Sequence, residues 1–182
     1  DLPYWAVRGD IVSVWMCFDD VPPSSQVQWV CGSHKWGLFQ PRHFVDASPY
    51  TGTEDMTPMP DLDDIITNQD GNSPFGKVVV KSFDARPGDA LIFHGRIIHA
   101  SAGAVSSETT NVCSSGSTTT SSSSSSQRRV ALRFAGNDVT YHHEGNRETA
   151  IPTPDVPHTL KHGDPLGSDP TCFPTLWPLT GG

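Results

Sequence analysis

Short stretches in which apolar residues alternate with polar ones, or run together, recur along this chain. Residues Gln26–Cys31 and Arg128–Ala135 alternate with the two-residue period of a strand that buries one face. Ile11–Phe18 is a run of β-branched and aromatic residues, which predicts a strand buried on both faces. Further short strands are expected by the same criteria at Lys77–Phe83, Ala90–Phe93 and Ile97–Ala100. Six or so short strands predict an all-β protein.

The stretches between these strands lack helical periodicity. Residues 33–76 are rich in Pro, Asp, Gly and Thr and predict a long surface excursion, with one helical turn around Asp61–Ile66. Residues 106–127 are almost wholly Ser and Thr, which predicts a disordered insertion. Residues 145–182 form a Pro-rich tail that we expect to pack on or near the barrel. The pattern predicts a β-sandwich or a jelly roll with long loops and few helices.

Composition and charge narrow the function classes. The chain has 182 residues, which suits one domain, and its 16 Gly and 16 Pro fit a loop-rich β fold. A net charge of -8 and the lack of a Lys/Arg cluster argue against nucleic-acid binding. No apolar run is long enough for a membrane span, and no signal peptide is recognised. The default location is therefore intracellular and cytoplasmic, with the peroxisome left open, and the oligomeric state is undetermined.

The start of the chain and its cysteines give two further expectations. The sequence opens without Met, in the middle of a motif, which predicts a single domain truncated at its N-terminus, a fragment of a longer protein. None of the four cysteines has CxxC spacing. Cys17 and Cys31 lie in apolar stretches and are expected to be buried thiols.

The stretch FHGRIIHASAG contains two histidines, of which His99 is the better ligand candidate. A buried histidine on its own is more often structural than metal-binding. His99, however, follows a turn and a strand, and the small residues after it leave room for a metal or substrate. Asp1, the first residue of the chain, offers a carboxylate. A carboxylate and an imidazole in a barrel mouth are two of the three ligands of the facial triad that holds non-haem Fe(II).

Four stretches, in this order, resemble the phytanoyl-CoA dioxygenase family. They are DLPYWAVRGDIVSVWMCFDDV, the V-x-GSHKWG piece at Val30–Gly37, GDALIFHGRIIHASAG, and RRVALRFAGNDVTY at Arg128–Tyr141. Together they span about residues 1–141. Members of this family are Fe(II)- and 2-oxoglutarate-dependent oxygenases built on a double-stranded β-helix, so the resemblance implies that fold and those two cofactors.

The resemblance also implies roles for individual residues. Asp1 resembles the carboxylate of the family's His-x-Asp motif, whose histidine would lie upstream of Asp1, and His99 resembles the distal histidine. Arg128 and Arg129 are both candidates for the arginine that holds the far carboxylate of 2-oxoglutarate. Alternation puts Arg129 on one face of its strand, with Ala131 and Arg133, and Arg128 on the other. The sequence does not show which face points inward.

The remaining candidates are less specific. Ser101 could donate a hydrogen bond to the cofactor, and the possible pocket residues are Trp5, Trp15 and His94. The implied reaction hydroxylates a small organic substrate, an acyl-CoA or another metabolite, with O2 while 2-oxoglutarate is decarboxylated to succinate. With two of three ligands, the chain alone is expected to bind iron weakly and can be inactive. Two alternatives stay open: a non-catalytic jelly roll or ligand-binding protein, and a cupin-type metal enzyme of another class.

Overall fold

A computed structural model gives the fold of the chain. It describes residues 1–43, 45–61, 64–65, 74–101, 128–143, 145, 147–149, 152 and 156–177. The predicted disordered insertion at 106–127 lies outside these residues. The described part consists of short strands, long loops, 3-10 helices of three residues each and one helical turn at residues 64–65. None of its helices has the length and apolar character needed to cross a bilayer.

The larger sheet is built around β2 (Ile11–Cys17). It pairs antiparallel with β5 (Ala90–His94) on one side and with β7 (Arg129–Ala135) on the other. The register places Ser13 between Phe93 of β5 and Arg133 of β7. Segments that are distant in sequence therefore meet on one face of this sheet.

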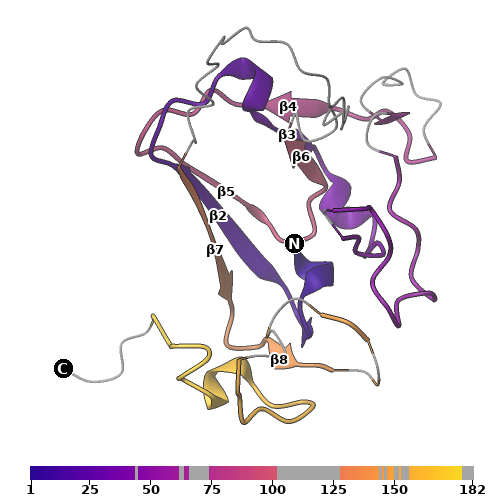
Figure 1. The fold of residues 1–182 in the computed structure, drawn as a ribbon, viewed down its shortest axis with the longest axis vertical. Helices are drawn as coiled ribbons and strands as arrows, with labels where there is room; N and C mark the ends of the chain where they lie inside the picture. Colours follow the sequence, from indigo (N-terminus) through magenta and orange to yellow (C-terminus); the bar gives the residue numbers. More distant parts are fainter. Residues whose placement is uncertain are drawn as a thin grey trace, which may run out of the picture.

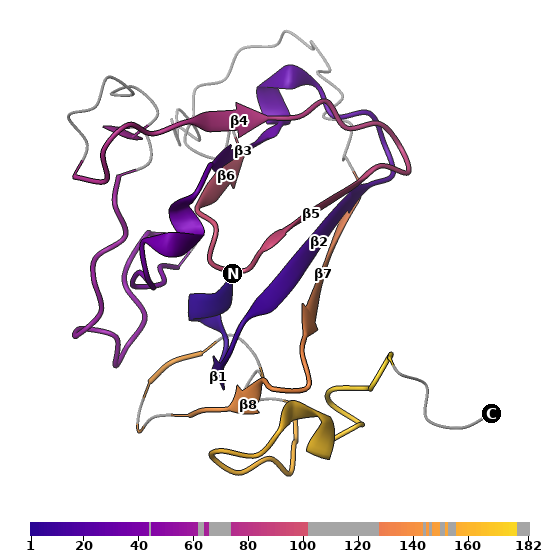
Figure 2. The same ribbon diagram turned by 180° about the vertical axis from the view of Figure 1, so that it is seen from behind.

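The second sheet is built around β3 (Val27–Val30), between β4 (Val80–Ser82) and β6 (His99–Ser101). Its pairings are also antiparallel, and Trp29 lies opposite His99. Figures 1 and 2 show the two sheets facing each other, with the N-terminus between them in both views. The predicted all-β jelly roll is confirmed, and six of the predicted strands are present with shifted ends.

A short two-stranded sheet closes one end of the molecule. It pairs β1 (Val7–Arg8) with β8 (Thr140–Tyr141), and the sequence pattern did not predict either strand. The 3-10 helices of the described part are η1 (Leu2–Tyr4), η2 (Pro23–Ser25), η3 (Ser33–Lys35) and η4 (Leu166–Ser168). Two-residue strands carry too little alternation to be distinguished from loop in the sequence.

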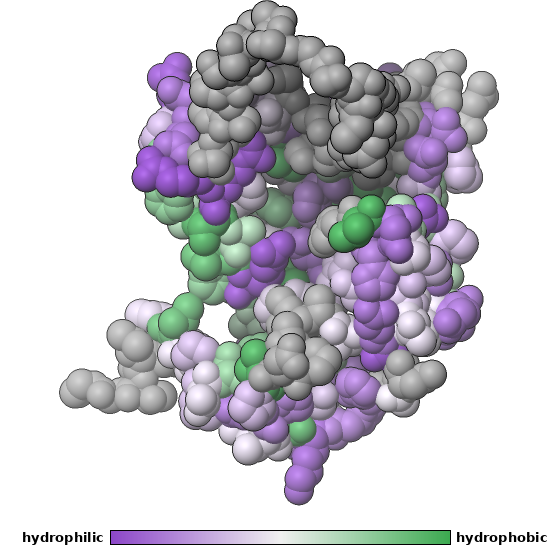
Figure 3. Space-filling model, in the orientation of Figure 1, coloured by the Kyte–Doolittle hydropathy of each residue, from purple (hydrophilic) through white to green (hydrophobic). Residues whose placement is uncertain are grey.

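The prediction that β2 is buried on both faces is wrong. Ile11, Ser13 and Cys17 are buried on the inner face, but Val12 on the outer face is 43% exposed. The register sets Val12 beside Phe134, which is also exposed. The outer face is thus apolar without a covering layer in the described part of the chain, and Figure 3 shows hydrophobic side chains along this side. An apolar run alone cannot separate these two arrangements.

The expected surface excursion over residues 33–76 contributes to the core. Phe39 and Ile65 are buried in a cluster with the strand residue Val30 and with Val78 and Ile98. The predicted helical turn is present near Ile65, whose amide donates to the Asp61 carbonyl oxygen at 3.1 Å. Apolar residues spaced irregularly in a loop can therefore fill a core that periodicity does not reveal.

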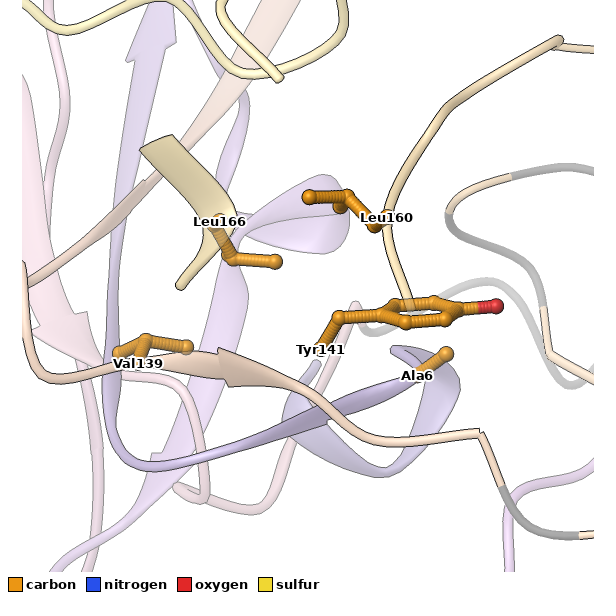
Figure 4. Close-up of a cluster of buried hydrophobic side chains, with 5 residues drawn as sticks. All are labelled: Ala6, Val139, Tyr141, Leu160 and Leu166. Atoms are coloured by element: carbon orange, nitrogen blue, oxygen red, sulfur yellow. The ribbon is translucent and has the colours of Figure 1, made fainter. Parts of the chain in front are cut away.

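The C-terminal residues pack against the small sheet. Ala6, Val139, Tyr141, Leu160 and Leu166 form one buried cluster, drawn in Figure 4. The Asp169 carboxylate holds the segment around Thr159 against η4, because it accepts hydrogen bonds from the Thr159 amide at 2.7 Å and from the Thr159 hydroxyl at 3.0 Å. These hydrogen bonds lower the pKa of Asp169.

The two cysteine predictions have different outcomes. Cys17 at the end of β2 is a buried free thiol, as expected. Cys31 is exposed, so that prediction is wrong. Cys31 follows the last residue of β3 and precedes Gly32, whose φ of 83° turns the chain away from the sheet.

We expect Ile11→Ala to lower the free energy of unfolding by about 2–5 kcal/mol, because Ile11 is fully buried and the substitution leaves a cavity. The matched control is Ile92→Ala on neighbouring β5, since Ile92 is 71% exposed and should change stability by less than about 0.5 kcal/mol. Chemical denaturation of both variants measures the difference. Equal losses would contradict the assignment of inner and outer faces.

Candidate metal and cofactor site

Asp1 and His99 meet between the two sheets. Asp1 directly precedes η1, which is tied to β5 because the Leu2 amide donates to the Gly95 carbonyl at 2.8 Å. His99 begins β6 in the second sheet. The Asp1 Oδ1 and the His99 Nε2 are 3.9 Å apart, and these side chains are 11% and 26% exposed. A carboxylate and an imidazole from distant parts of the sequence thus share one partly buried location.

The surroundings of His99 fix its protonation state. Its Nδ1 lies 3.0 Å from the Ile97 carbonyl oxygen, which can only accept, so Nδ1 carries the hydrogen. Burial lowers the pKa of His99 to about 4, and the ring is therefore neutral near pH 7. The ring also packs 5.1 Å from the Phe93 ring, centre to centre. As a result, Nε2 presents a lone pair towards Asp1.

The gap between Asp1 and His99 suits a cation better than a direct contact. Two acceptors, a carboxylate oxygen and an imidazole lone pair, face each other across 3.9 Å, which is too long for a hydrogen bond. With a neutral ring the two residues are not an ion pair. A carboxylate oxygen and an imidazole nitrogen are ligand types of the Fe(II) facial triad, so this pair fits two positions of that set.

Two further residues hold the Asp1 carboxylate. The Ser13 hydroxyl donates to Oδ2 at 2.5 Å, and the Arg133 guanidinium donates to Oδ1 at 2.9 Å. Ser13 and Arg133 are direct partners in the β2–β7 register. Neither residue was selected from the sequence. Ser13 had a detectable signal, because a hydroxyl on the buried face of a strand needs a partner.

The structure separates the two candidate arginines. Arg128 points outward, where its Nη2 lies 2.7 Å from Asp19 Oδ1, and its side chain is 74% exposed. These hydrogen bonds lower the pKa of Asp19 to about 2. Arg129 lies opposite Cys17 on the inner face, with its guanidinium 5.7 Å from the centre of the Trp15 ring. The inner face of β7 therefore carries Arg129 and Arg133.

The structure does not bring His94 to the Asp1–His99 pair. His94 lies next to Phe93 on β5 and so points to the other side of the sheet. There its Nε2 is 3.7 Å from Asp10 Oδ2, and its ring is 5.3 Å from that of His34. His94 thus belongs to a separate polar contact near the surface.

The other predicted pocket residues take different places. Trp5 packs against Phe173 of the tail, with ring centres 6.4 Å apart and the ring planes tilted by 44°. Trp15 lies below Arg129. The backbone of Ser101 pairs with Val27 at the end of β6, and its side chain lies outside the described parts.

Two cavities adjoin the site. One of about 240 Å³ is lined by Asp1 and His99 together with apolar residues such as Phe39 and Met59. The other, of about 790 Å³, lies between Arg133 on β7 and the C-terminal residues. In the described part of the chain no group of three His, Cys, Asp or Glu residues is arranged to hold a metal. The site therefore offers two donors, with the smaller cavity beside them.

Comparisons with known proteins show which family and which solved structures this chain is similar to. A family model described as phytanoyl-CoA dioxygenase (PhyH) matches residues 1–110. Two solved structures are similar: the non-heme alpha ketoglutarate dependent epimerase SnoN from nogalamycin biosynthesis, and SnoN in complex with Fe3+, alpha ketoglutarate and nogalamycin RO.

The likeness to the SnoN structures is distant. Their identities to this chain are 18% and 17%, each with a TM-score of 0.49 over 91% of the chain. The matches cover 51% and 52% of the SnoN chains, so this chain spans about half their length. No curated protein matches the chain.

We expect Ser13→Ala to lower the free energy of unfolding by about 1–3 kcal/mol, because a buried carboxylate oxygen then loses its donor. Ser48→Ala is the matched control: its hydroxyl also donates to a carboxylate, that of Asp46 at 2.7 Å, but at an exposed position. Its cost should stay below about 0.5 kcal/mol. Denaturant titration of both variants tests this, and a Ser13 variant as stable as the wild type would contradict it.

Proposed function

The chain belongs to the phytanoyl-CoA dioxygenase family, and from this premise we propose that the protein is a non-haem Fe(II)- and 2-oxoglutarate-dependent dioxygenase that hydroxylates a small organic substrate. Members of the family use Fe(II) and 2-oxoglutarate. The observation that carries the proposal is the Asp1–His99 pair, in which a buried carboxylate faces the lone pair of a neutral imidazole at 3.9 Å. Both residues lie within the matched range of 1–110.

Asp1 and His99 would be the protein's ligands to iron in this part of the chain. Fe(II) with 2-oxoglutarate, when bound, supplies the oxidising chemistry: 2-oxoglutarate and O2 give succinate and CO2, and one oxygen atom enters a C–H bond of the substrate. The hydrogen bond from His99 Nδ1 to the Ile97 carbonyl keeps Nε2 available as a ligand. Ser13 and Arg133 keep the Asp1 carboxylate between the sheets.

Arg129 is the better of the two arginines for binding the far carboxylate of 2-oxoglutarate. It lies on the inner face of β7, whereas Arg128 is already paired with Asp19 outside. Arg129 is four residues from Arg133, which corresponds to about 13 Å along a strand. That distance leaves room between Asp1 and the backbone of Arg129 for a five-carbon diacid and the arginine side chain. The Trp15 ring beside the guanidinium can restrict its orientation.

The substrate side of the proposal is less specific. The cavity beside Asp1 and His99 is about 240 Å³, with Phe39 and Met59 in its apolar lining. This supports a small substrate group near the metal position, from an acyl-CoA or another metabolite. One observation favours the second candidate, a non-catalytic ligand-binding jelly roll: the described residues supply two metal donors rather than three.

We expect the purified protein to bind Fe(II) without oxygen, weakly because the described residues supply two donors, and to release succinate when given excess Fe(II), ascorbate, 2-oxoglutarate and O2. His99→Ala should abolish both, because it removes an imidazole ligand. His94→Ala is the matched control, since His94 contacts Asp10 on the other side of β5, and both readouts should stay near wild type. Calorimetric titration and succinate quantification provide the measurements. A protein with neither Fe(II) binding nor succinate release would support the non-catalytic alternative.

A second test addresses the cofactor arginine. Arg129→Met should weaken 2-oxoglutarate binding about 10–100-fold, because one charge-assisted hydrogen-bond pair contributes roughly 1.5–3 kcal/mol. Arg128→Met removes the same charge from the adjacent position and should leave the affinity within about twofold. Anaerobic titration of the Fe(II)-loaded protein with 2-oxoglutarate measures both. A larger loss for Arg128→Met would reverse the assignment.

A further inference from the structure

We propose that Arg133 is a positioning residue, which holds the Asp1 carboxylate so that its remaining lone pairs face His99. The inference rests on the proposed function, because it assumes that Asp1 and His99 bind the metal. It adds a residue that none of the sequence motifs or comparisons assigns. Arg133 would act through Asp1 rather than touch the metal, the substrate or O2.

The contacts of Arg133 support a fixed orientation. Its Nη2 donates to Asp1 Oδ1 at 2.9 Å, and its Nη1 donates to the Ala131 carbonyl at 3.1 Å. The side chain is 28% exposed, unlike that of Arg128 at the start of the same strand, which is 74% exposed. A guanidinium withdrawn from water needs an anionic partner, and Asp1 is that partner.

Arg133 and Ser13 form a two-point support for one carboxylate. Ser13 binds Oδ2 and Arg133 binds Oδ1, so rotation of the Asp1 carboxylate would break one of the two hydrogen bonds. Both supports come from paired positions on adjacent strands, which makes their separation a property of the sheet. An ionised carboxylate oxygen can accept more than one bond, and Oδ1 therefore keeps capacity on the side of His99.

The charges in the loaded site make the inference specific. A guanidinium alone near a divalent cation would oppose metal binding. With 2-oxoglutarate present, the metal contributes two positive charges, the diacid two negative charges and Asp1 one negative charge, while His99 is neutral. Arg129 offsets the far carboxylate in its proposed role, so these charges sum to zero before Arg133 is counted. A favourable contribution of Arg133 must therefore come from holding the Asp1 carboxylate in place, and it must exceed the repulsion between the guanidinium and the metal.

Arg133 does not fit the role of the arginine that binds the far carboxylate of 2-oxoglutarate. It already bonds to the carboxylate that would bind the metal, so it lies beside the near end of a diacid chelated there. Arg129, further along the same face of β7, is better placed for the far end. The two arginines would therefore have separable effects, on metal affinity and on 2-oxoglutarate affinity.

The test is a titration with Co(II), followed by its visible absorption without oxygen and with 2-oxoglutarate present. Arg133→Met should weaken Co(II) binding about 10–100-fold, the loss typical of residues that orient a metal ligand. Arg133→Lys retains the charge and one donor, and it should recover most of the affinity. Arg128→Met, directly before the same strand, is the matched control and should stay within about twofold. Thermal unfolding confirms that each variant is folded, and Arg133→Lys decides the question if Arg133→Met is not.

Several outcomes would overturn the inference. Unchanged or tighter Co(II) binding in folded Arg133→Met would show that charge repulsion dominates, while the proposed function would stand. Weaker 2-oxoglutarate binding with unchanged Co(II) affinity in the absence of 2-oxoglutarate would make Arg133 a cofactor-binding residue instead. A wild-type protein that binds no Co(II) would refute the proposed function and the inference together.

The Ser13→Ala, Arg133→Met double variant tests whether the two residues act together on Asp1. A loss of Co(II) binding free energy that differs from the sum of the two single losses would support joint action, and strict additivity would refute it.

Discussion

The proposed metal site depends on the hydrogen bonds that Ser13 and Arg133 donate to the Asp1 carboxylate. A carboxylate that is 11% exposed cannot remain charged without partners, and β2 and β7 supply them through Ser13 and Arg133. These partners depend in turn on the register between the two strands, which places them side by side. A shift of β7 by one residue would turn Arg133 to the outer face and leave Oδ1 of the carboxylate without this donor.

The alternation of side chains along β7 also decides which arginines face the interior between the two sheets. Arg129 and Arg133 lie on the inner face of β7 because they are paired with Cys17 and Ser13, both buried. Arg128, which precedes the strand, instead meets Asp19 in an exposed pair. Exposed ion pairs contribute little to stability. The position of Arg128 outside the interior therefore follows from the alternation of side chains rather than from its ion pair with Asp19. Strand geometry thus places adjacent arginines on different sides of the sheet.

The sequence predicted the strands well because each is a short apolar or alternating run, but it could not predict what covers them. It gave no sign that the outer face of β2 is exposed at Val12, or that Phe39 in a loop is buried. It selected Asp1 and His99 through a family resemblance, and the structure brings the two together. Ser13 and Arg133 were missed because their importance depends on strand register, which a single strand's pattern does not specify.

The position of His99 shows why the second sheet matters as much as the first. Its ring is held by the Ile97 carbonyl on one side and packs against Phe93 from the larger sheet on another. The carbonyl sets the tautomer, while burial keeps the ring neutral. A protonated ring would satisfy Asp1 directly and remove the lone pair that a metal needs. The packing of the two sheets therefore maintains the unpaired acceptor on Nε2, on which the proposed cation site depends as much as on the histidine itself.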